Sequence, residues 1–147
     1  MVKTTDDESL PDHIGWRLWQ ANRVWLKTFA EAMRASGHDW FTDSRAGLMG
    51  LIPRTGIRQS ALIERTGTTK QAVQQLLDGL EAEGIIERAA DPLDGRGNIV
   101  RYTEKGLQAL RAGDRIKRDI ERQYRERIGP ERFDALVDAL RALDAGS

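Results

Sequence analysis

Residues 66–84 read TGTTKQAVQQLLDGLEAEG and have the pattern of a helix with one apolar and one polar side. The apolar positions recur as one stripe of a 3.6-residue helix, and they are Ala72, Val73, Leu76, Leu77 and Leu80. The opposite side carries Lys70, Gln71, Gln74 and Gln75. Thr68 and Gln71 have the spacing of a capping box, so the helix is predicted to start just after Gly67 and to end at Gly84.

The polar side of this helix suits a nucleic acid. Glutamine amides can pair bidentately with adenine, and a lysine ammonium can neutralise a phosphate. We interpret the helix as a DNA recognition helix. The alternative, an ordinary solvated helix face, stays open on these residues alone.

A second short helix is predicted immediately upstream, over residues 58–65, with Ala61 and Leu62 directed inward. The Thr-Gly-Thr segment that joins the two helices predicts a helix-turn-helix, in which the first helix braces the second. Pro53 and Gly56 break the chain before it. They leave Arg54 at a loop tip, where a phosphate contact is plausible, and Arg58 at the helix start is a further candidate contact.

After Gly84 the pattern changes from helical to extended. Residues 85–88 and 99–102 are predicted to form two short strands, and the ten residues between them, AADPLDGRGN, are dense in turn formers. Arg96 is the only cationic residue in this long tip. Behind a helix-turn-helix, such a hairpin is a wing that can place an arginine in the minor groove.

The run from residue 42 to about 107 resembles the MarR (multiple-antibiotic-resistance regulator) family of bacterial transcription factors. The wing carries the resemblance through Asp91-Pro92, Asp94, Arg96, Val100 and Thr103, followed by Glu-Lys-Gly. The resemblance implies a mainly α fold with a small β-hairpin wing, a winged helix-turn-helix flanked by N- and C-terminal dimerisation helices.

The resemblance also implies roles for individual residues. Arg96 would enter the minor groove, and Asp94 would orient its guanidinium. The major-groove side would present Thr69, Lys70, Gln71, Gln74 and Gln75, with Thr68 beside them. Gly79 departs from the expectation for a recognition helix, because glycine costs roughly 1 kcal/mol relative to alanine there.

The domain boundaries follow from the flanking patterns. We expect a flexible arm at residues 1–11 and one MarR-like domain at 12–147, with the DNA-binding region at 42–103. Residues 12–36, capped by Asp12, and residues 104–147 are expected to form the dimerisation helices. A two-fold dimer would bind a pseudo-palindromic operator in double-stranded DNA.

Composition narrows the function classes. The 147 residues carry 23 basic and 23 acidic side chains, so any DNA affinity must arise from local placement of charge. The chain has no cysteine, no apolar run that spans a membrane and no signal peptide pattern, which favours a cytoplasmic protein without membrane contact. No nucleophile, phosphate loop or metal-ligand spacing points to an enzyme, and we expect no cofactor.

Aromatic residues are concentrated in the first third of the chain. His13, Trp16 and Trp19 are candidate contacts for a small-molecule, aromatic effector, and core or dimer packing is the alternative. We therefore predict a homodimeric, sequence-specific DNA-binding regulator, a repressor that an effector releases. The alternative function is a winged-helix protein-interaction module that does not bind DNA.

Overall fold

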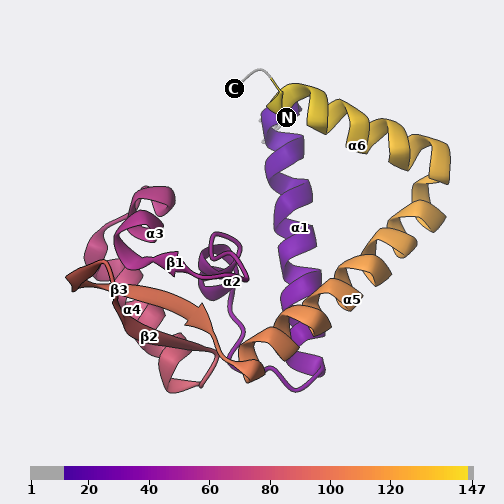
Figure 1. Ribbon diagram of the computed structural model, residues 1–147. Helices are drawn as coiled ribbons and strands as arrows, with labels where there is room; N and C mark the ends of the chain where they lie inside the picture. The colour runs from indigo at the N-terminus through magenta and orange to yellow at the C-terminus, as the bar shows by residue number, and fades with distance from the viewer. Residues whose placement is uncertain (1–11, 146–147) are drawn as a thin grey trace, which may run out of the picture.

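The protein consists of six helices and a small antiparallel sheet over residues 12–145, the part described by this computed structural model (Figure 1). The elements in chain order are α1 (Ile14–Ala35), α2 (Asp43–Met49), β1 (Ile57–Arg58), α3 (Gln59–Thr66), α4 (Lys70–Ala82), β2 (Ile86–Asp91), β3 (Asp94–Tyr102), α5 (Glu104–Ile128) and α6 (Pro130–Asp144). The predicted mainly α fold with a winged helix-turn-helix is confirmed. The arm expected at residues 1–11 lies outside the described residues.

The sheet has three strands in the order β1-β3-β2. The sequence predicted a hairpin of two strands, and β1 was missed because it is two residues long and was assigned to the start of a helix. Ile57 pairs with Val100 and Arg58 with Ile99. β1 thus joins the segment before α3 to the central strand of the wing.

The wing strands are longer than predicted, and the long tip expected at residues 89–98 is wrong. Apart from a register shift between Ala90 and Asp91, the ladder extends through the turn-forming residues to the pair Asp91–Asp94. Only Pro92 and Leu93 lie outside the strands. Backbone pairing does not require apolar side chains, so a polar, glycine-containing segment can still complete the hairpin.

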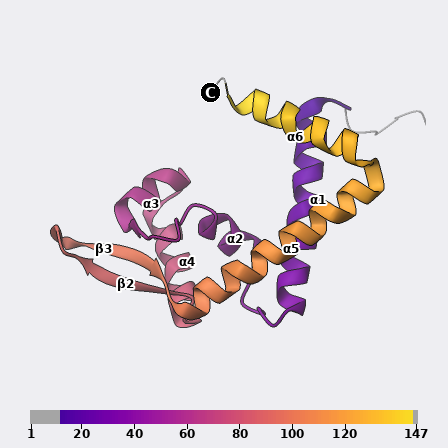
Figure 2. The same cartoon turned by 45° about the vertical axis from the view of Figure 1, so that its right-hand side comes forward.

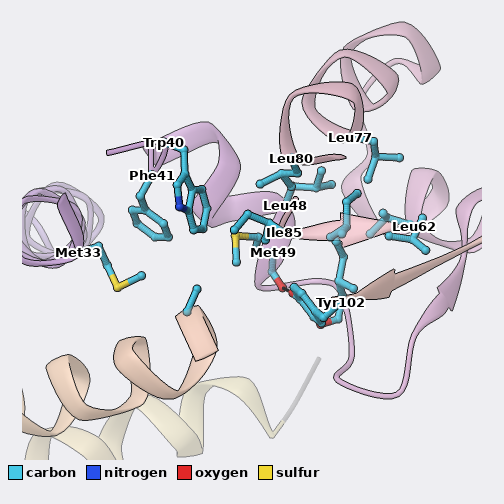
Figure 3. Close-up of a cluster of buried hydrophobic side chains, with 14 of the residues drawn as sticks. Met33, Trp40, Phe41, Leu48, Met49, Leu62, Leu77, Leu80, Ile85 and Tyr102 are labelled. Atoms are coloured by element: carbon cyan, nitrogen blue, oxygen red, sulfur yellow. Dashed lines mark hydrogen bonds between the residues drawn. The ribbon is translucent and has the colours of Figure 1, made fainter. Parts of the chain in front are cut away.

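The core of the winged region lies between α3, α4 and the sheet (Figure 3). Val73, Leu77 and Leu80 on the inner side of α4 are fully buried. They pack with Leu62 of α3 and Val100 of β3 in the same cluster. The buried stripe of α4 is narrower than predicted, because Ala72 is exposed and Leu76 is half-buried.

Helix α1 is buried only along its C-terminal half, at Phe29, Ala30 and Met33. The predicted cap at Asp12 is wrong. The Nδ1 atom of His13 accepts a hydrogen bond from the backbone N–H of Trp16 at 3.2 Å, and Asp12 pairs with Arg17 instead. A histidine nitrogen therefore takes the capping position usually held by a carboxylate or hydroxyl oxygen.

The long helices form an open frame beside the winged region (Figure 2). α5 crosses α1, and α6 runs from the far end of α5 back toward the N-terminal end of α1. Among residues 12–145 no helix has the length and apolar character needed to cross a membrane.

Candidate nucleic-acid interface

The recognition helix α4 begins one residue later than predicted. Thr69, not Thr68, is the N-cap, and its Oγ1 accepts from the backbone N–H of Ala72 at 3.2 Å. The hydroxyl of Thr68 instead bonds the hydroxyl of Thr66 at 3.1 Å. Gly67 between them has φ 63°, so the left-handed turn between α3 and α4 is the one expected of glycine.

The polar side of α4 faces solvent. Lys70, Gln71 and Gln75 are exposed and Gln74 is half-buried, while Val73 and Leu77 on the other side are fully buried. Packing fixes the inner side of the helix, so the backbone positions that carry Lys70, Gln71 and Gln75 are fixed while their side chains remain available to a partner.

A groove of about 530 Å³, the wing groove, lies between α3, α4 and the wing. Its lining residues include Gln59, Ser60, Glu64, Lys70, Gln74, Asp94, Arg96 and Asn98. The structure therefore brings Lys70 and Gln74 of α4 together with Asp94 and Arg96 of β3, a separate segment of the chain. Thr68, Thr69, Gln71 and Gln75 are not among its lining residues. Sequence reasoning missed Gln59, Ser60 and Asn98, although the polar start of α3 directly before a recognition helix was a usable signal.

Asp94 has a local hydrogen bond in the wing turn. Its Oδ1 accepts from the backbone N–H of Arg96 at 3.1 Å. A carboxylate two residues before an N–H forms this local bond readily. The role of Asp94 in orienting the guanidinium stays a prediction. Arg96 itself is exposed at the tip.

Two further candidate DNA contacts have other partners. Arg58 belongs to β1 and pairs with Asp91, its Nε lying 2.9 Å from an oxygen of that buried carboxylate. The other oxygen of Asp91 accepts from the backbone N–H of Leu93 at 2.9 Å. Arg54 pairs with Asp114 of α5. The hydrogen bond from Arg54 lowers the pKa of Asp114, so this carboxylate stays ionised. Neither arginine lines the wing groove.

Comparison with known proteins finds similarity to one family of regulators. The sequence model of the MarR family matches residues 41–97. The transcriptional regulator HosA of Escherichia coli O111:H- is 28% identical over 98 residues, which cover 67% of this chain and 73% of HosA. A probable transcriptional regulator from Pseudomonas aeruginosa, 28% identical, matches in structure with a TM-score of 0.70 over 90% of this chain and 97% of that one. The chain is similar to the MarR family over residues 41–97.

The fold also matches MarR itself. The apo form of wild-type MarR from Escherichia coli has a TM-score of 0.75 over 91% of this chain and 98% of that one, at 18% identity. This likeness is one of fold. The related proteins with curated names are transcriptional regulators, which is consistent with a DNA-binding regulator.

Ion pairs hold the wing against the recognition helix. Arg88 of β2 is largely buried and pairs with Asp78 and Glu81 on the C-terminal half of α4. The hydrogen bond from Arg88 lowers the pKa of Glu81. Glu81 therefore does not present an unpaired acidic charge near the end of the helix.

A second cavity, the helix cavity, measures about 230 Å³ and lies between α1, α2 and α5. Apolar walls come from Phe29, Met33, Phe41 and Met49, and charged groups from Arg54, Asp114 and Lys117. His13, Trp16 and Trp19 do not line it. The two indoles stack on each other with ring centroids 5.0 Å apart, and Trp19 lies about 15 Å from Phe29 along α1.

Proposed function

We propose that the chain is a homodimeric, sequence-specific DNA-binding transcriptional regulator, a repressor that a small-molecule effector releases. The observation that carries the proposal is the wing groove, where Lys70 and Gln74 of α4 lie on the same surface as Arg96 of the wing. Amides and an ammonium can read base edges and phosphates in a major groove, while a wing arginine suits the adjacent minor groove.

Homodimer formation is supported by uncovered apolar side chains on the helical frame. Ile14, Trp19 and Val24 of α1 are 70%, 52% and 47% exposed, and Leu136 and Leu143 of α6 are 46% and 66% exposed. A monomer gains little from presenting so many apolar groups on neighbouring helices. A two-fold pair would place two copies of α4 on one face of a duplex, which requires a pseudo-palindromic operator.

The effector is proposed to occupy the helix cavity. Its walls are mainly apolar, and Lys117 supplies a cation, so a small aromatic carboxylic acid fits its chemistry. α2 forms one wall and contacts α4, so a ligand that changes the position of α2 can change the placement of the recognition helix. The effector-binding site predicted at His13, Trp16 and Trp19 remains the alternative.

Binding of the DNA beside the gene for this protein tests the proposal. We expect specific binding that weakens steeply with salt, since phosphate contacts release counterions. Arg96→Ala is expected to lower affinity about 10-fold or more. Arg111→Ala is the matched control, because this exposed arginine on α5 pairs only with Glu104 among the ion pairs described. Binding that ignores both salt and Arg96→Ala would instead favour a protein-interaction module.

The effector site is tested by repeating the binding measurement with a panel of aromatic carboxylic acids. An acid that releases DNA from the wild-type protein should do so less effectively with Lys117→Ala and equally well with Trp19→Ala. The reverse pattern would place the effector at the tryptophans.

A further inference from the structure

A short segment of the chain joins the helix cavity to the wing. Residues 54–58, the strap, begin with Arg54, whose side chain lines the cavity. They end with Arg58 of β1, whose Nε lies 2.9 Å from the buried carboxylate of Asp91 at the end of β2. The same five residues therefore reach from the proposed effector site to the tip that carries Arg96.

The strap is attached firmly to the central strand of the wing. Ile57 pairs with Val100 of β3. A Cβ atom at Gly56 would lie 3.1 Å from the carbonyl oxygen of Val100, so the two backbones are in close contact there. Just before the strap, the carbonyl of Ile52 accepts a hydrogen bond from the hydroxyl of Tyr102, also in β3, at 3.3 Å. A displacement of the strap is therefore passed on to β3.

The attachment of the strap to α5 is weaker. The Nη2 atom of Arg54 lies 2.5 Å from a carboxylate oxygen of Asp114, and the two side chains are 53% and 37% exposed. An ion pair this open to water contributes little to stability, so its partners can be exchanged at small cost. The strap thus has a firm anchor on the wing and an exchangeable anchor on α5.

The charges of the helix cavity leave one carboxylate to be matched. Arg54 and Lys117 bring two positive charges to its lining, and Asp114 brings one negative charge. A ligand with a single carboxylate would balance them, while its apolar part would lie against Phe29 and Met33. That carboxylate would compete with Asp114 for Arg54, and Asp114 would still have Lys117 as a neighbouring cation.

We propose that the strap couples the helix cavity to the wing through an exchange of partners at Arg54. This inference rests on the proposed function. Without an effector, Arg54 binds Asp114, and the strap holds the wing tip in the position that suits DNA. A monocarboxylate in the cavity replaces Asp114 as the partner of Arg54, and β1 carries the displacement to Asp91 and to the turn that presents Arg96. A fall of about 10-fold in operator affinity requires that the ligand prefer the displaced strap by the same factor.

Asp114→Asn tests the exchange, because the amide keeps the shape of the side chain and removes the competing charge. In isothermal titration calorimetry we expect benzoate to bind this variant about 5-fold more tightly than the wild-type protein. Arg54→Gln should bind benzoate about 10-fold more weakly, because a charge-assisted hydrogen bond is lost. The matched control is Glu104→Gln, which removes the carboxylate of another exposed ion pair on α5 and should leave benzoate binding unchanged. Benzamide, the neutral analogue, should gain nothing from Asp114→Asn.

Hydrogen–deuterium exchange measures the coupling without DNA. Benzoate should speed exchange in residues 54–58 and 89–96 of the wild-type protein, and Asp114→Asn should show this faster exchange before ligand is added. The inference is overturned if these two segments exchange in Asp114→Asn as they do in Glu104→Gln, or if benzoate binds neither the wild-type protein nor Asp114→Asn. If both measurements follow expectation but the wild-type protein binds no operator DNA, the exchange at Arg54 stands and the proposed DNA-binding function fails.

Discussion

The side chain of Arg45 explains why glycine occupies position 79 inside α4. Glycine in a helix interior costs roughly 1 kcal/mol relative to alanine. A Cβ atom at this position would lie 2.6 Å from a guanidinium nitrogen of Arg45. The other terminal nitrogen of Arg45 donates to the carbonyl of Trp40 at 2.8 Å. Gly79 thus leaves room for the side chain of Arg45. This side chain bonds the segment before α2 and lies against the recognition helix.

We expect Gly79→Ala to change the free energy of unfolding by less than about 1 kcal/mol, because the gain in helix propensity is offset by displacement of Arg45. In an Arg45→Ala background, Gly79→Ala should raise the free energy of unfolding by about 1 kcal/mol. Urea denaturation of the four proteins of this double-mutant cycle measures the difference. An equal gain in both backgrounds would contradict the contact.

Tyr102 provides a pH-dependent prediction at the same scale. Its hydroxyl donates to the carbonyls of Met49 and Ile52, at 2.9 and 3.3 Å, and burial raises the pKa of Tyr102 to about 12. The folded state then holds a proton that the unfolded state loses above about pH 10. The stabilisation is complete below about pH 10 and is lost as pH rises toward 12.

The pH dependence is measured against Tyr102→Phe. Between about pH 10 and 12 the wild-type protein should lose roughly 3 kcal/mol more stability than the variant. At neutral pH the variant should be less stable by about 1 kcal/mol, because the hydroxyl bond is missing. Parallel stability curves for the two proteins across the alkaline range would exclude a buried, neutral hydroxyl.

At the scale of the element, the wing is a strand pair with supports on both sides. β1 pairs with β3 on one edge, and Arg58 reaches from β1 to the buried Asp91 of β2. On the other edge, Arg88 joins β2 to α4. A hairpin of two strands is only marginally stable alone in water, so these contacts hold the arginine-bearing tip in a defined position.

Asp91→Ala should destabilise the protein by roughly 1–3 kcal/mol, because Arg58 and the backbone N–H of Leu93 both lose their acceptor. DNA affinity should fall with it, since the turn that carries Arg96 loses its support. The control is Asp119→Ala, which removes an exposed partner of Arg122 and should change stability by less than about 0.5 kcal/mol. Equal effects of the two substitutions on thermal unfolding would show that Asp91 is not a wing support.

At the scale of the whole molecule, the winged region is well packed and the helical frame is open. Phe133 is the buried residue of α6, while Leu136, Leu140 and Leu143 on the same helix remain exposed. The N-terminal half of α1 also carries exposed apolar side chains. The described residues thus leave apolar faces uncovered on the helices that the proposed dimer uses.

Leu140→Glu should convert the proposed dimer into a monomer, because a carboxylate cannot be buried unpaired in an apolar interface. Sedimentation velocity measures the change, and operator affinity should fall by more than 10-fold because each monomer contacts only one half-site. The matched control for sedimentation is Leu93→Glu on the wing, where leucine is 83% exposed and lies outside the helices of the proposed dimer. A wild-type protein that sediments as a monomer would remove the basis of this prediction.

Local sequence patterns were sufficient for the helices, the Gly67 and Gly84 turns and the existence of the wing. Each of these depends on periodicity or on backbone conformation over a few residues, which neighbouring side chains dictate. The same reasoning failed for β1, whose two residues become a strand only by pairing with Ile99 and Val100 more than forty positions later. Short strands carry no periodic signal of their own.

The candidate interface divides in the same way. The amides of α4 and the arginine of the wing could be found from their spacing and family resemblance. The partners of Arg54, Arg58 and Arg88, the position of Gln59 in the groove and the location of the helix cavity could not. These depend on side chains from distant segments, and which of them meet is settled by how the helices and sheet pack around a shared core.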